Sequence, residues 1–370
     1  MACAGTPRGP KAALTRFPIG IYGGNDPKHL ARLKSDGFDS FHCSWKDFDR
    51  LAAMAKEAKH QGMRMIISPD EIRRKASSHI QEWPVDAWYL FDEPDVHRLS
   101  SATLQGISEQ TRSWDPERPQ TFVIGQGSPT NVYGRIGDIL MMDWYPVPHR
   151  APDSVADQID LLMKTLPKGK PFWMVIQAYD WADEIKDPTK IKGLRFPNRH
   201  EIRFMSYIAV MHGARGLFYC TLLKKGKTLF EYPELWQEVS VVTREIRDMR
   251  PVFERGKRVR LPFPPNPDGV EAKAWRYKNR DHVIILNRKA TVYQKVPEEL
   301  FNGLWQPIHC AKNNCREALS SFYGAWYLRP YHVMVFKSRL NWFRGLSRGL
   351  PIATSCDQDD TLTRSRHLVK

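Results

Sequence analysis

Short apolar runs alternate with longer segments of helical period along the first two thirds of the chain. The runs are rich in β-branched and aromatic residues, which is typical of buried strands. The predicted strands cover residues 18–22, 38–45, 64–68, 87–93, 120–124, 137–145, 171–177 and 216–220. The predicted helices cover residues 26–36, 46–60, 99–114, 154–166, 198–212 and 233–249.

Eight strands alternating with helices predict a parallel sheet with right-handed crossovers, and eight is the number that closes a (β/α)8 TIM barrel. A doubly wound sheet is the alternative. Against it, Gly23-Gly24-Asn25-Asp26 after the first strand lacks the glycine spacing of a dinucleotide-binding loop. We therefore expect an α/β barrel over residues 17–255.

The pattern changes after this barrel. Strand-like runs are now separated by turn residues, with no segment of helix length between them, at residues 270–275, 282–287 and 331–336. This predicts a small antiparallel β-sandwich domain over residues 256–337. Residues 1–16 form an N-terminal extension, and residues 338–370 have the aperiodic, basic composition of a disordered tail.

Composition and charge narrow the class of protein. Of 370 residues, 42% are hydrophobic and 11% are aromatic, which is typical of a globular chain, and no stretch approaches the length of a membrane span. The formal net charge of +15 suggests an anionic partner, such as nucleic acid or an acidic carbohydrate. Because the charges are dispersed and no nucleic-acid-binding motif occurs, we favour a basic surface without a dedicated partner.

The cysteines indicate neither a metal site nor a cofactor, because the 6 cysteines and 12 histidines lack the spacing of metal ligands. Cys310 and Cys315 are close enough to form a small disulfide in an oxidising compartment, whereas Cys43 and Cys220 lie in apolar runs and are expected to be core thiols. The segment around Cys3 is similar to the start of a mature bacterial lipoprotein. The localisation therefore stays open between a lipid-anchored and a cytoplasmic protein.

The predicted fourth strand ends abruptly in two carboxylates and a proline, Asp92-Glu93-Pro94. Side chains alternate along a strand, so we expect Asp92 and Glu93 to leave it on opposite sides, with Glu93 directed into the barrel. A strand-end acid that only bonds a neighbouring loop is the alternative. The residues at the other strand ends decide between these interpretations.

Reacting groups of eight-stranded barrels lie at the C-terminal ends of the strands. At those ends this chain has carboxylates, amides and aromatic rings, the residue types that bind sugar hydroxyls and stack on sugar rings. A tryptophan such as Trp181 is, taken singly, more often a core residue, so the prediction rests on convergence. The candidate substrate-binding residues are Tyr22, Trp45, Asp92, Tyr145, Gln177, Tyr179, Asp180, Trp181 and Tyr219.

The segment Leu90-Phe91-Asp92-Glu93-Pro94 resembles the strand-four motif of the clan A glycoside hydrolases, the β-galactosidase-like barrels, whose Asn-Glu-Pro carries the acid/base glutamate. The chain is more similar to an uncharacterised group of these barrels with an Asp-Glu-Pro variant. The further matches are Asp143-Trp144-Tyr145-Pro146 at strand six, Lys170, Pro171, Trp173 and Gln177 at strand seven, and Gly213-Ala214-Arg215-Gly216 before strand eight. The resemblance covers residues 17–336 and implies a glycosidase with a terminal β-sandwich.

Two departures from that pattern affect the expected mechanism. Asp92 replaces the clan's asparagine, and Gln177 stands near the place of its nucleophilic glutamate. Glycoside hydrolysis generally needs an acid and a second carboxylate. We expect Glu93 to be the acid, with its pKa raised by an aromatic surround of the Trp88 or Tyr145 kind. Its predicted partner is Asp143, and the alternatives are Asp180, Asp92 and Glu71.

Three functions remain open. The first is hydrolysis of a β-linked polysaccharide or oligosaccharide through Glu93. The second, suggested by the missing strand-seven glutamate, is carbohydrate binding without catalysis. The third takes the net charge as primary and makes the protein a binder of nucleic acid or acidic glycan. As an anion in place of an amide, Asp92 could pair with an amino-sugar ammonium or orient a nearby Arg or Tyr; the second is favoured.

Overall fold

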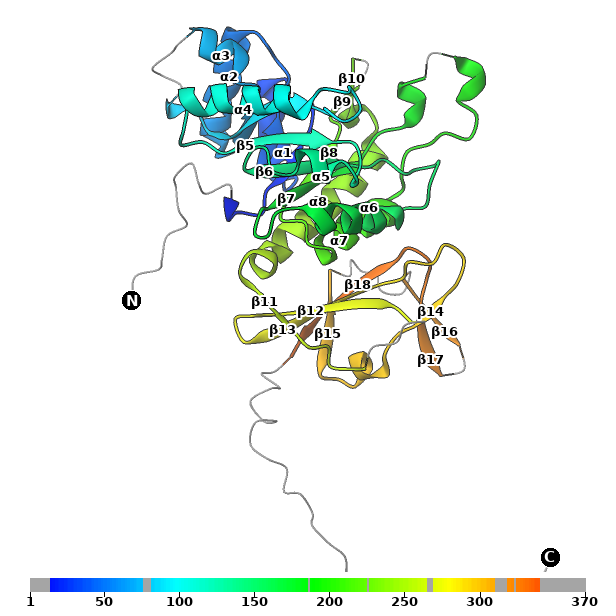
Figure 1. Ribbon diagram of the computed structural model, residues 1–370. Coiled ribbons are helices and arrows are strands. Elements are labelled where there is room, and N and C mark those ends of the chain that lie inside the picture. The colour runs from blue at the N-terminus through cyan, green and yellow to red at the C-terminus, as the bar shows by residue number, and fades with distance from the viewer. Residues whose placement is uncertain are drawn as a thin grey trace, which may run out of the picture.

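The computed structural model describes residues 14–75, 81–185, 187–224, 226–264, 269–309, 318–322 and 324–339. Eight parallel strands pair in sequence order and close on themselves through β1 and β8, which confirms the predicted (β/α)8 barrel (Figure 1). The barrel strands are β1 (Ile19–Ile21), β2 (Ser40–His42), β3 (Arg64–Ile67), β4 (Val85–Asp92), β5 (Gln120–Ile124), β6 (Ile139–Asp143), β7 (Phe172–Gln177) and β8 (Leu217–Cys220).

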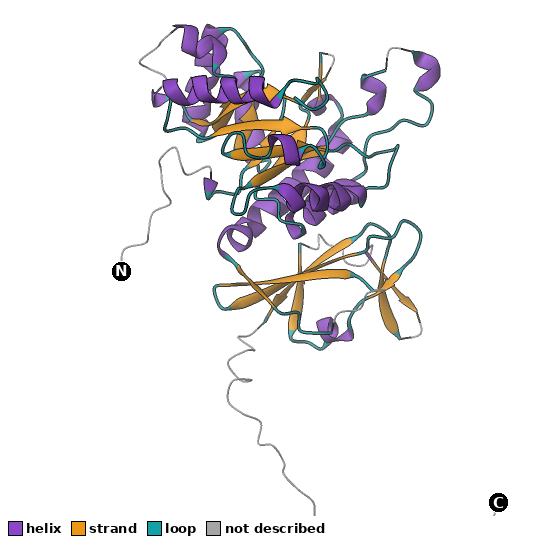
Figure 2. Cartoon of the chain, in the orientation of Figure 1, coloured by secondary structure: helices purple, strands orange, loops and turns teal. Residues whose placement is uncertain are grey.

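Helices surround these strands (Figure 2). They are α1 (Leu30–Ser35), α2 (Phe48–Gln61), α3 (Asp70–Lys75), α4 (Ser101–Trp114), α5 (Thr130–Tyr133), α6 (Ser154–Thr165), α7 (Arg199–Met211) and α8 (Pro233–Arg255). Short 3₁₀ helices cover Pro27–His29, Trp181–Asp183, Pro188–Lys190, Leu229–Glu231 and Glu298–Phe301. The short α3 and α5 were not predicted, because one or two turns carry too little periodicity to be recognised.

Local signals explain where the longer helices begin and end. Asn198 accepts the Glu201 N–H while the Glu201 carboxylate accepts the Asn198 N–H, and this capping box begins α7. Gly62 ends α2 in the left-handed conformation that glycine adopts without strain. The helix predicted over residues 233–249 continues through Pro251 to Arg255 in the structure. A proline inside a helix removes one hydrogen bond without necessarily ending it.

The barrel has a filled interior, so its chemistry is confined to the two ends. Nine buried side chains from β3 to β8 pack inside it: Ile66, Ala87, Tyr89, Val123, Ile139, Met141, Trp173, Val175 and Phe218. Gly20 on β1 leaves room for this packing, since a Cβ there would lie 2.1 Å from the Phe218 ring. A larger apolar layer lies between the strands and the surrounding helices.

At the N-terminal ends of the strands, buried carboxylates are joined to arginines. Asp39 lies 3.2 Å from Arg16 Nη1 and 2.6 Å from Arg250 Nη2, and it also accepts the Ile19 N–H. Asp86 pairs with Arg16 and lies 3.5 Å from Arg64 Nε. Each buried charge at this end therefore has an opposite charge beside it, as a stable interior requires.

A second domain follows α8. Its five-stranded sheet orders β11 (Lys257–Val259), β12 (Glu271–Tyr277), β13 (Arg280–Leu286), β18 (Val333–Ser338) and β15 (Trp305–Ile308). Its three-stranded sheet orders β14 (Gln294–Lys295), β17 (Ala325–Leu328) and β16 (Leu319–Phe322). The predicted antiparallel β-sandwich is confirmed. Lys278 and Asn279 make the β12–β13 turn with φ of 46° and 58°, as a two-residue hairpin loop requires.

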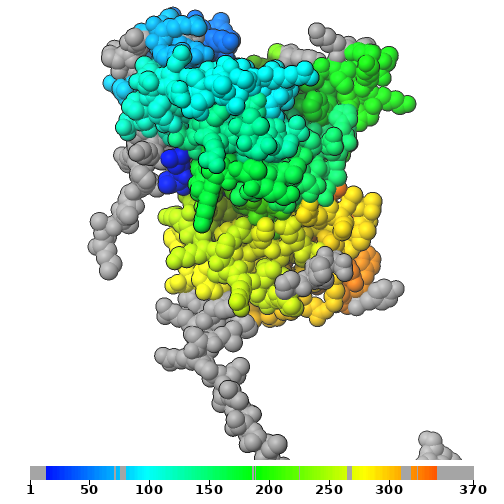
Figure 3. Space-filling model, viewed as in Figure 1, coloured from blue at the N-terminus to red at the C-terminus, as the bar shows by residue number. Residues whose placement is uncertain are grey.

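The sandwich lies directly against the outer helices of the barrel, with no gap between them (Figure 3). Arg203 of α7 binds Glu245 of α8, with an Nη2–Oε1 distance of 2.6 Å, and also donates to the Val333 carbonyl of β18. Lys273 and Arg258 of the sandwich donate to the Met211 carbonyl at the C-terminus of α7, at 2.7 and 3.0 Å. Cations are favoured at that end of a helix dipole.

Several expectations fall outside the described residues. They concern Cys3 and most of the N-terminal extension, the Cys310–Cys315 disulfide, and the tail after Arg339. Cys43 is buried beside β2, as expected, whereas Cys220 is only partly buried at the end of β8. Within the described chain, no helix combines the length and the apolar character needed to cross a membrane.

Candidate active site at the C-terminal end of the barrel

The end of β4 does not alternate as a regular strand would. The register of β4 on β5 shifts between Tyr89 and Asp92, and Glu93 has a left-handed backbone with φ of 46°. As a result, Asp92 accepts the hydroxyl of Tyr89, an interior residue, while the Glu93 carboxyl reaches Asp143 at the end of β6. The expectation that Asp92 and Glu93 point to opposite sides is wrong, because an irregular strand end brings both to the same mouth.

Neighbouring groups hold Glu93 in this unusual conformation. Its N–H donates to the Val123 carbonyl and its own carbonyl accepts the His97 N–H. Gly125 at the end of β5 lets the carboxyl approach, since a Cβ there would lie 3.2 Å from Glu93 Oε1. A left-handed glutamate costs free energy, and such strain is retained mainly at functional sites.

Asp143 is the last residue of β6 and is only 8% exposed. Its Oδ1 finds no N–H or O–H donor among the described residues, although its carboxyl group receives a hydrogen bond from Tyr145. Burial and the adjacent Glu93 carboxylate raise the pKa of Asp143 well above its usual value. Burial and Asp92 likewise raise the pKa of Glu93, and the two carboxyl groups meet in a hydrogen bond. A single proton shared between them relieves the repulsion of two adjacent anions.

Three aromatic rings form one wall of the mouth. Tyr145 follows β6, and Tyr179 and Trp181 follow β7, with ring centroids 5.1 to 6.4 Å apart. Trp181 Nε1 donates to the Tyr145 carbonyl at 3.1 Å, and Asp180 caps the turn by accepting the Ala182 N–H at 2.9 Å. Asp180 is thereby held by its own loop, while the rings of Tyr145 and Trp181 stay partly exposed.

The opposite wall is built from β1, β2 and β4. Tyr22 lies 4.6 Å from the His42 ring and its hydroxyl donates to that of Tyr89 at 3.3 Å. The His42 ring also lies 4.5 Å from that of Tyr89, and burial lowers the pKa of His42 to about 4, so the imidazole is neutral at pH 7. Tyr22 remains partly exposed and can meet a ligand.

Several predicted residues are not placed at the open mouth. Gln177 is fully buried, with its amide bonded to the N–H and carbonyl of Val147, at 2.9 and 2.7 Å. Tyr219 is also fully buried, and its hydroxyl lies 3.0 Å from that of Ser206 on α7. Trp45 is partly buried at the edge, with Nε1 bonded to the Asn25 carbonyl. We therefore leave Gln177 and Tyr219 out of the binding set.

Trp88 does not surround Glu93, contrary to expectation. It is fully buried on the outer face of β4, where its Nε1 donates to Asp115 at 3.2 Å and its ring packs on Trp114. Side chains alternate regularly in this part of β4, so Trp88 points outward to α4. Among the alternative acids, the side chain of Glu71 lies outside the described part of the structure.

Residues that sequence reasoning left out of the site are Tyr89 and Asp95. Tyr89 is hidden in an apolar strand run, and only the register shift explains its contact with Asp92. Asp95 accepts the Gly125 N–H, with N–O distances of 3.1 and 3.2 Å, and so stabilises the loop around Glu93. Its position two residues after Glu93 was the only available signal.

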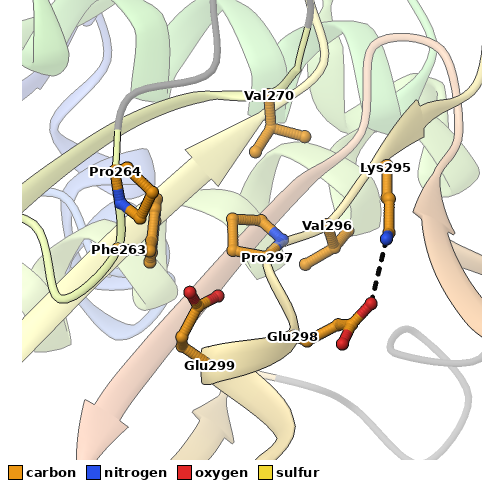
Figure 4. Close-up of a pocket in the computed structure, with 8 residues that line it drawn as sticks. All are labelled: Phe263, Pro264, Val270, Lys295, Val296, Pro297, Glu298 and Glu299. Carbon is orange, nitrogen blue, oxygen red and sulfur yellow. Dashed lines mark hydrogen bonds and ion pairs between the residues drawn. The ribbon is translucent and has the colours of Figure 1, made fainter.

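A separate cavity of about 290 Å³ lies in the sandwich domain (Figure 4). Phe263, Val270, Val296 and neighbouring prolines line it, and Lys295 Nζ bonds Glu298 Oε1 at 2.9 Å beside it. No carboxyl pair with raised pKa values, like Glu93 and Asp143, is found among the described residues that line this cavity. Within the described chain, no three His, Cys, Asp or Glu side chains are arranged to hold a metal ion.

Sequence comparison finds no matching family model and no matching curated protein. Solved structures match at the level of fold. A GH30 endoxylanase from Clostridium papyrosolvens C71 has 12% identity and a TM-score of 0.52, over 88% of this chain and 96% of that chain. AmyP bound to maltotriose has 8% identity and a TM-score of 0.52, over 92% and 99%. Cyclic α-maltosyl-(1→6)-maltose hydrolase from Arthrobacter globiformis has 9% identity and a TM-score of 0.52, over 89% and 99%.

Proposed function

With the fold of a clan A-like glycoside hydrolase barrel as the premise, we propose that this protein hydrolyses a glycosidic bond in a β-linked oligosaccharide or polysaccharide. The observation that carries the proposal is the Glu93–Asp143 pair, two hydrogen-bonded carboxyls with raised pKa values at the barrel mouth. Carboxyl pairs of this kind divide into one proton donor and one anion. Glycoside hydrolysis uses both.

In this mechanism Glu93 is the acid. Its proton goes to the glycosidic oxygen, the bond from that oxygen to the anomeric carbon breaks, and the Asp143 carboxylate bonds the same carbon. Glu93 then takes a proton from water, which attacks the anomeric carbon and releases Asp143. A direct hydrogen bond between Glu93 and Asp143 supports the shorter carboxyl separation of retaining enzymes over the longer one of inverting enzymes.

The aromatic walls supply the sugar platform. Tyr22 on one side and Tyr145 and Trp181 on the other are partly exposed at the same end of the barrel as Glu93. Aromatic faces stack on the apolar faces of sugar rings, and the Asp92 carboxylate, which is exposed, can accept sugar hydroxyls.

The test is product release from a panel of β-linked polysaccharides and chromogenic glycosides, with wild type, Glu93→Gln and Asp143→Asn measured side by side. We expect each variant to lose about 10²-fold or more of kcat/KM. Glu117→Gln is the matched control, because Glu117 is exposed in the loop before β5, at the other end of the barrel. Proton NMR of the first product identifies the anomer, and an inverted anomer would exclude Asp143 as nucleophile.

A carbohydrate-binding protein without catalysis is the second candidate. The end of β7 favours this candidate. It carries Gln177 and no carboxylate, and the Gln177 amide is already bonded to the Val147 backbone. In that case no substrate of the panel is cleaved, and Glu93→Gln binds sugar as well as wild type. Isothermal titration with oligosaccharides separates the two candidates.

A further inference from the structure

The barrel mouth holds more acid than hydrolysis requires. Four carboxyls interact there, Asp92, Glu93, Asp95 and Asp143, and the proposed reaction uses two of them. Asp95 is occupied by the Gly125 N–H. Asp92 is the surplus group: one of its oxygens accepts the Tyr89 hydroxyl at 2.6 Å, and the side chain is otherwise exposed at the mouth.

Among the described residues, the opposing charge that acts on these carboxyls is that of His97 beside Glu93. None of the four carboxyls forms an ion pair with a lysine or arginine there, although the whole chain carries a net charge of +15. Burial and Asp92 raise the pKa of Glu93 despite His97, and the His42 imidazole is neutral because burial lowers its pKa to about 4. Lys224 pairs with Glu184 and lies 4.7 Å from the centroid of the Tyr179 ring. The mouth is thus locally anionic on a basic protein.

A second observation concerns hydrogen bonding rather than charge. Asp143 Oδ1 is buried and lacks a hydrogen-bond partner among the described residues, although Tyr145 donates to the carboxyl group. An unpaired buried acceptor costs about as much as a lost hydrogen bond. A ligand that brings N–H donors to the mouth removes that cost.

We infer that the sugar unit bound at this mouth carries a free, protonated amine, held by Asp92 beside the Glu93–Asp143 pair. This inference rests on the proposed glycosidase function for its kinetic consequences only. An ammonium group satisfies unpaired carboxylate oxygens and is also attracted to the faces of the surrounding rings of Tyr22, Tyr145 and Trp181. The acidic carbohydrate suggested by the net charge does not suit this site, because its carboxylates would meet Asp92.

The experiment compares three matched sets of β-linked hexasaccharides, in gluco and galacto configuration: free amine, N-acetylated amine, and hydroxyl. Hydrolysis and calorimetric binding are measured for wild type at low and high salt. We expect kcat/KM for the free amine to exceed that for either counterpart by roughly 10- to 100-fold, with a preference that weakens at high salt. Preference for the hydroxyl or the N-acetylated set overturns the inference while leaving the glycosidase proposal standing.

Binding separates the two proposals further. If no set is cleaved but the free-amine hexasaccharides bind more tightly than the others, the inference holds and the hydrolytic proposal fails. If nothing binds or is cleaved, both fail. Asp92→Asn should reduce the amine preference to within about threefold of unity, whereas Glu117→Gln should retain it. An unchanged preference in Asp92→Asn contradicts the assigned role of Asp92.

Discussion

The carboxylates at the two ends of this barrel have opposite kinds of neighbour. At the N-terminal end, Asp39 and Asp86 are each surrounded by arginines, and Asp39 also accepts a backbone N–H. At the C-terminal end, Glu93 and Asp143 face each other and no arginine or lysine of the described chain pairs with them. The same side-chain chemistry therefore stabilises one end and leaves electrostatic strain at the other.

Under the proposed function, this contrast assigns stability to one end of the barrel and catalysis to the other. A buried carboxylate beside an arginine is inert, because its charge is already neutralised. A buried carboxylate beside another carboxylate has a raised pKa and can therefore stay protonated and act as a proton donor. The C-terminal end is thus the end that can do acid–base chemistry. The stability that its carboxyl pair loses is offset by the ion pairs at the N-terminal end.

The largest effect is expected where the paired end is broken. Asp39→Asn removes the shared partner of Arg16 and Arg250, and breaking such a buried pair costs about 3–5 kcal/mol. Thermal unfolding should show a fall in Tm of roughly 5–10 °C. A fall below about 1 °C would mean that the network contributes little to stability.

Single aspartates from the two ends should respond to pH with opposite sign. Burial alone would raise the pKa of Asp115, but hydrogen bonds and charge from Arg118 lower it. The stability from Asp115 is therefore present above its unfolded pKa and lost as pH falls through the folded value, so Asp115→Asn should be destabilising at pH 7 and nearly neutral below about pH 3. For Asp143, the raised pKa gives stability that is present below the unfolded pKa and lost as pH rises through the folded value.

Asp143→Asn should accordingly raise stability by about 1–2 kcal/mol at pH 7 and change little near pH 3, while hydrolysis is lost. Urea unfolding of wild type and of both aspartate variants at pH 3 and pH 7 measures the four differences. Equal signs for the two variants at pH 7 would contradict the contrast between the ends.

A smaller effect concerns the proton on Glu93. Its pKa is raised by burial and by Asp92, so activity should fall as pH rises through that value and the proton donor is lost. Asp92→Asn removes one neighbouring charge and should move the alkaline limb of kcat/KM to lower pH by up to about one unit. A pH profile with a neutral chromogenic glycoside tests this, and a shift to higher pH would count against it.

The smallest effect is expected from a pair that belongs to neither end. Lys59 and Glu82 lie 3.5 Å apart with both side chains largely exposed, so Glu82→Gln should change stability by less than about 0.5 kcal/mol. It is the control for the unfolding series. A change as large as that of Asp39→Asn would show that burial is not the variable that matters.

Sequence periodicity predicted the barrel because each strand is an apolar run covered on both sides, and that pattern is strong. It also selected Glu93 and Asp143, since strand ends of a parallel barrel meet at one mouth. It could not predict that Asp92 joins them, because a register shift on β5 and a left-handed residue are tertiary features that override alternation. Periodicity also predicted Gln177 at the open mouth. The structure buries it, because its amide bonds to the N–H and carbonyl of Val147, which belong to another loop.

Arg203 attaches the sandwich to the barrel, and this attachment determines whether the two domains can be separated. One guanidinium binds Glu245 within the barrel and the Val333 carbonyl of the sandwich, and the hydroxyl of Tyr207 donates to the same Glu245 at 2.7 Å. Cutting the chain after α8 would expose to water the Arg203 guanidinium and the Met211 carbonyl, which both bond to the sandwich domain. The barrel is therefore a poor candidate for modular recombination, and the two domains are expected to be inherited as a unit.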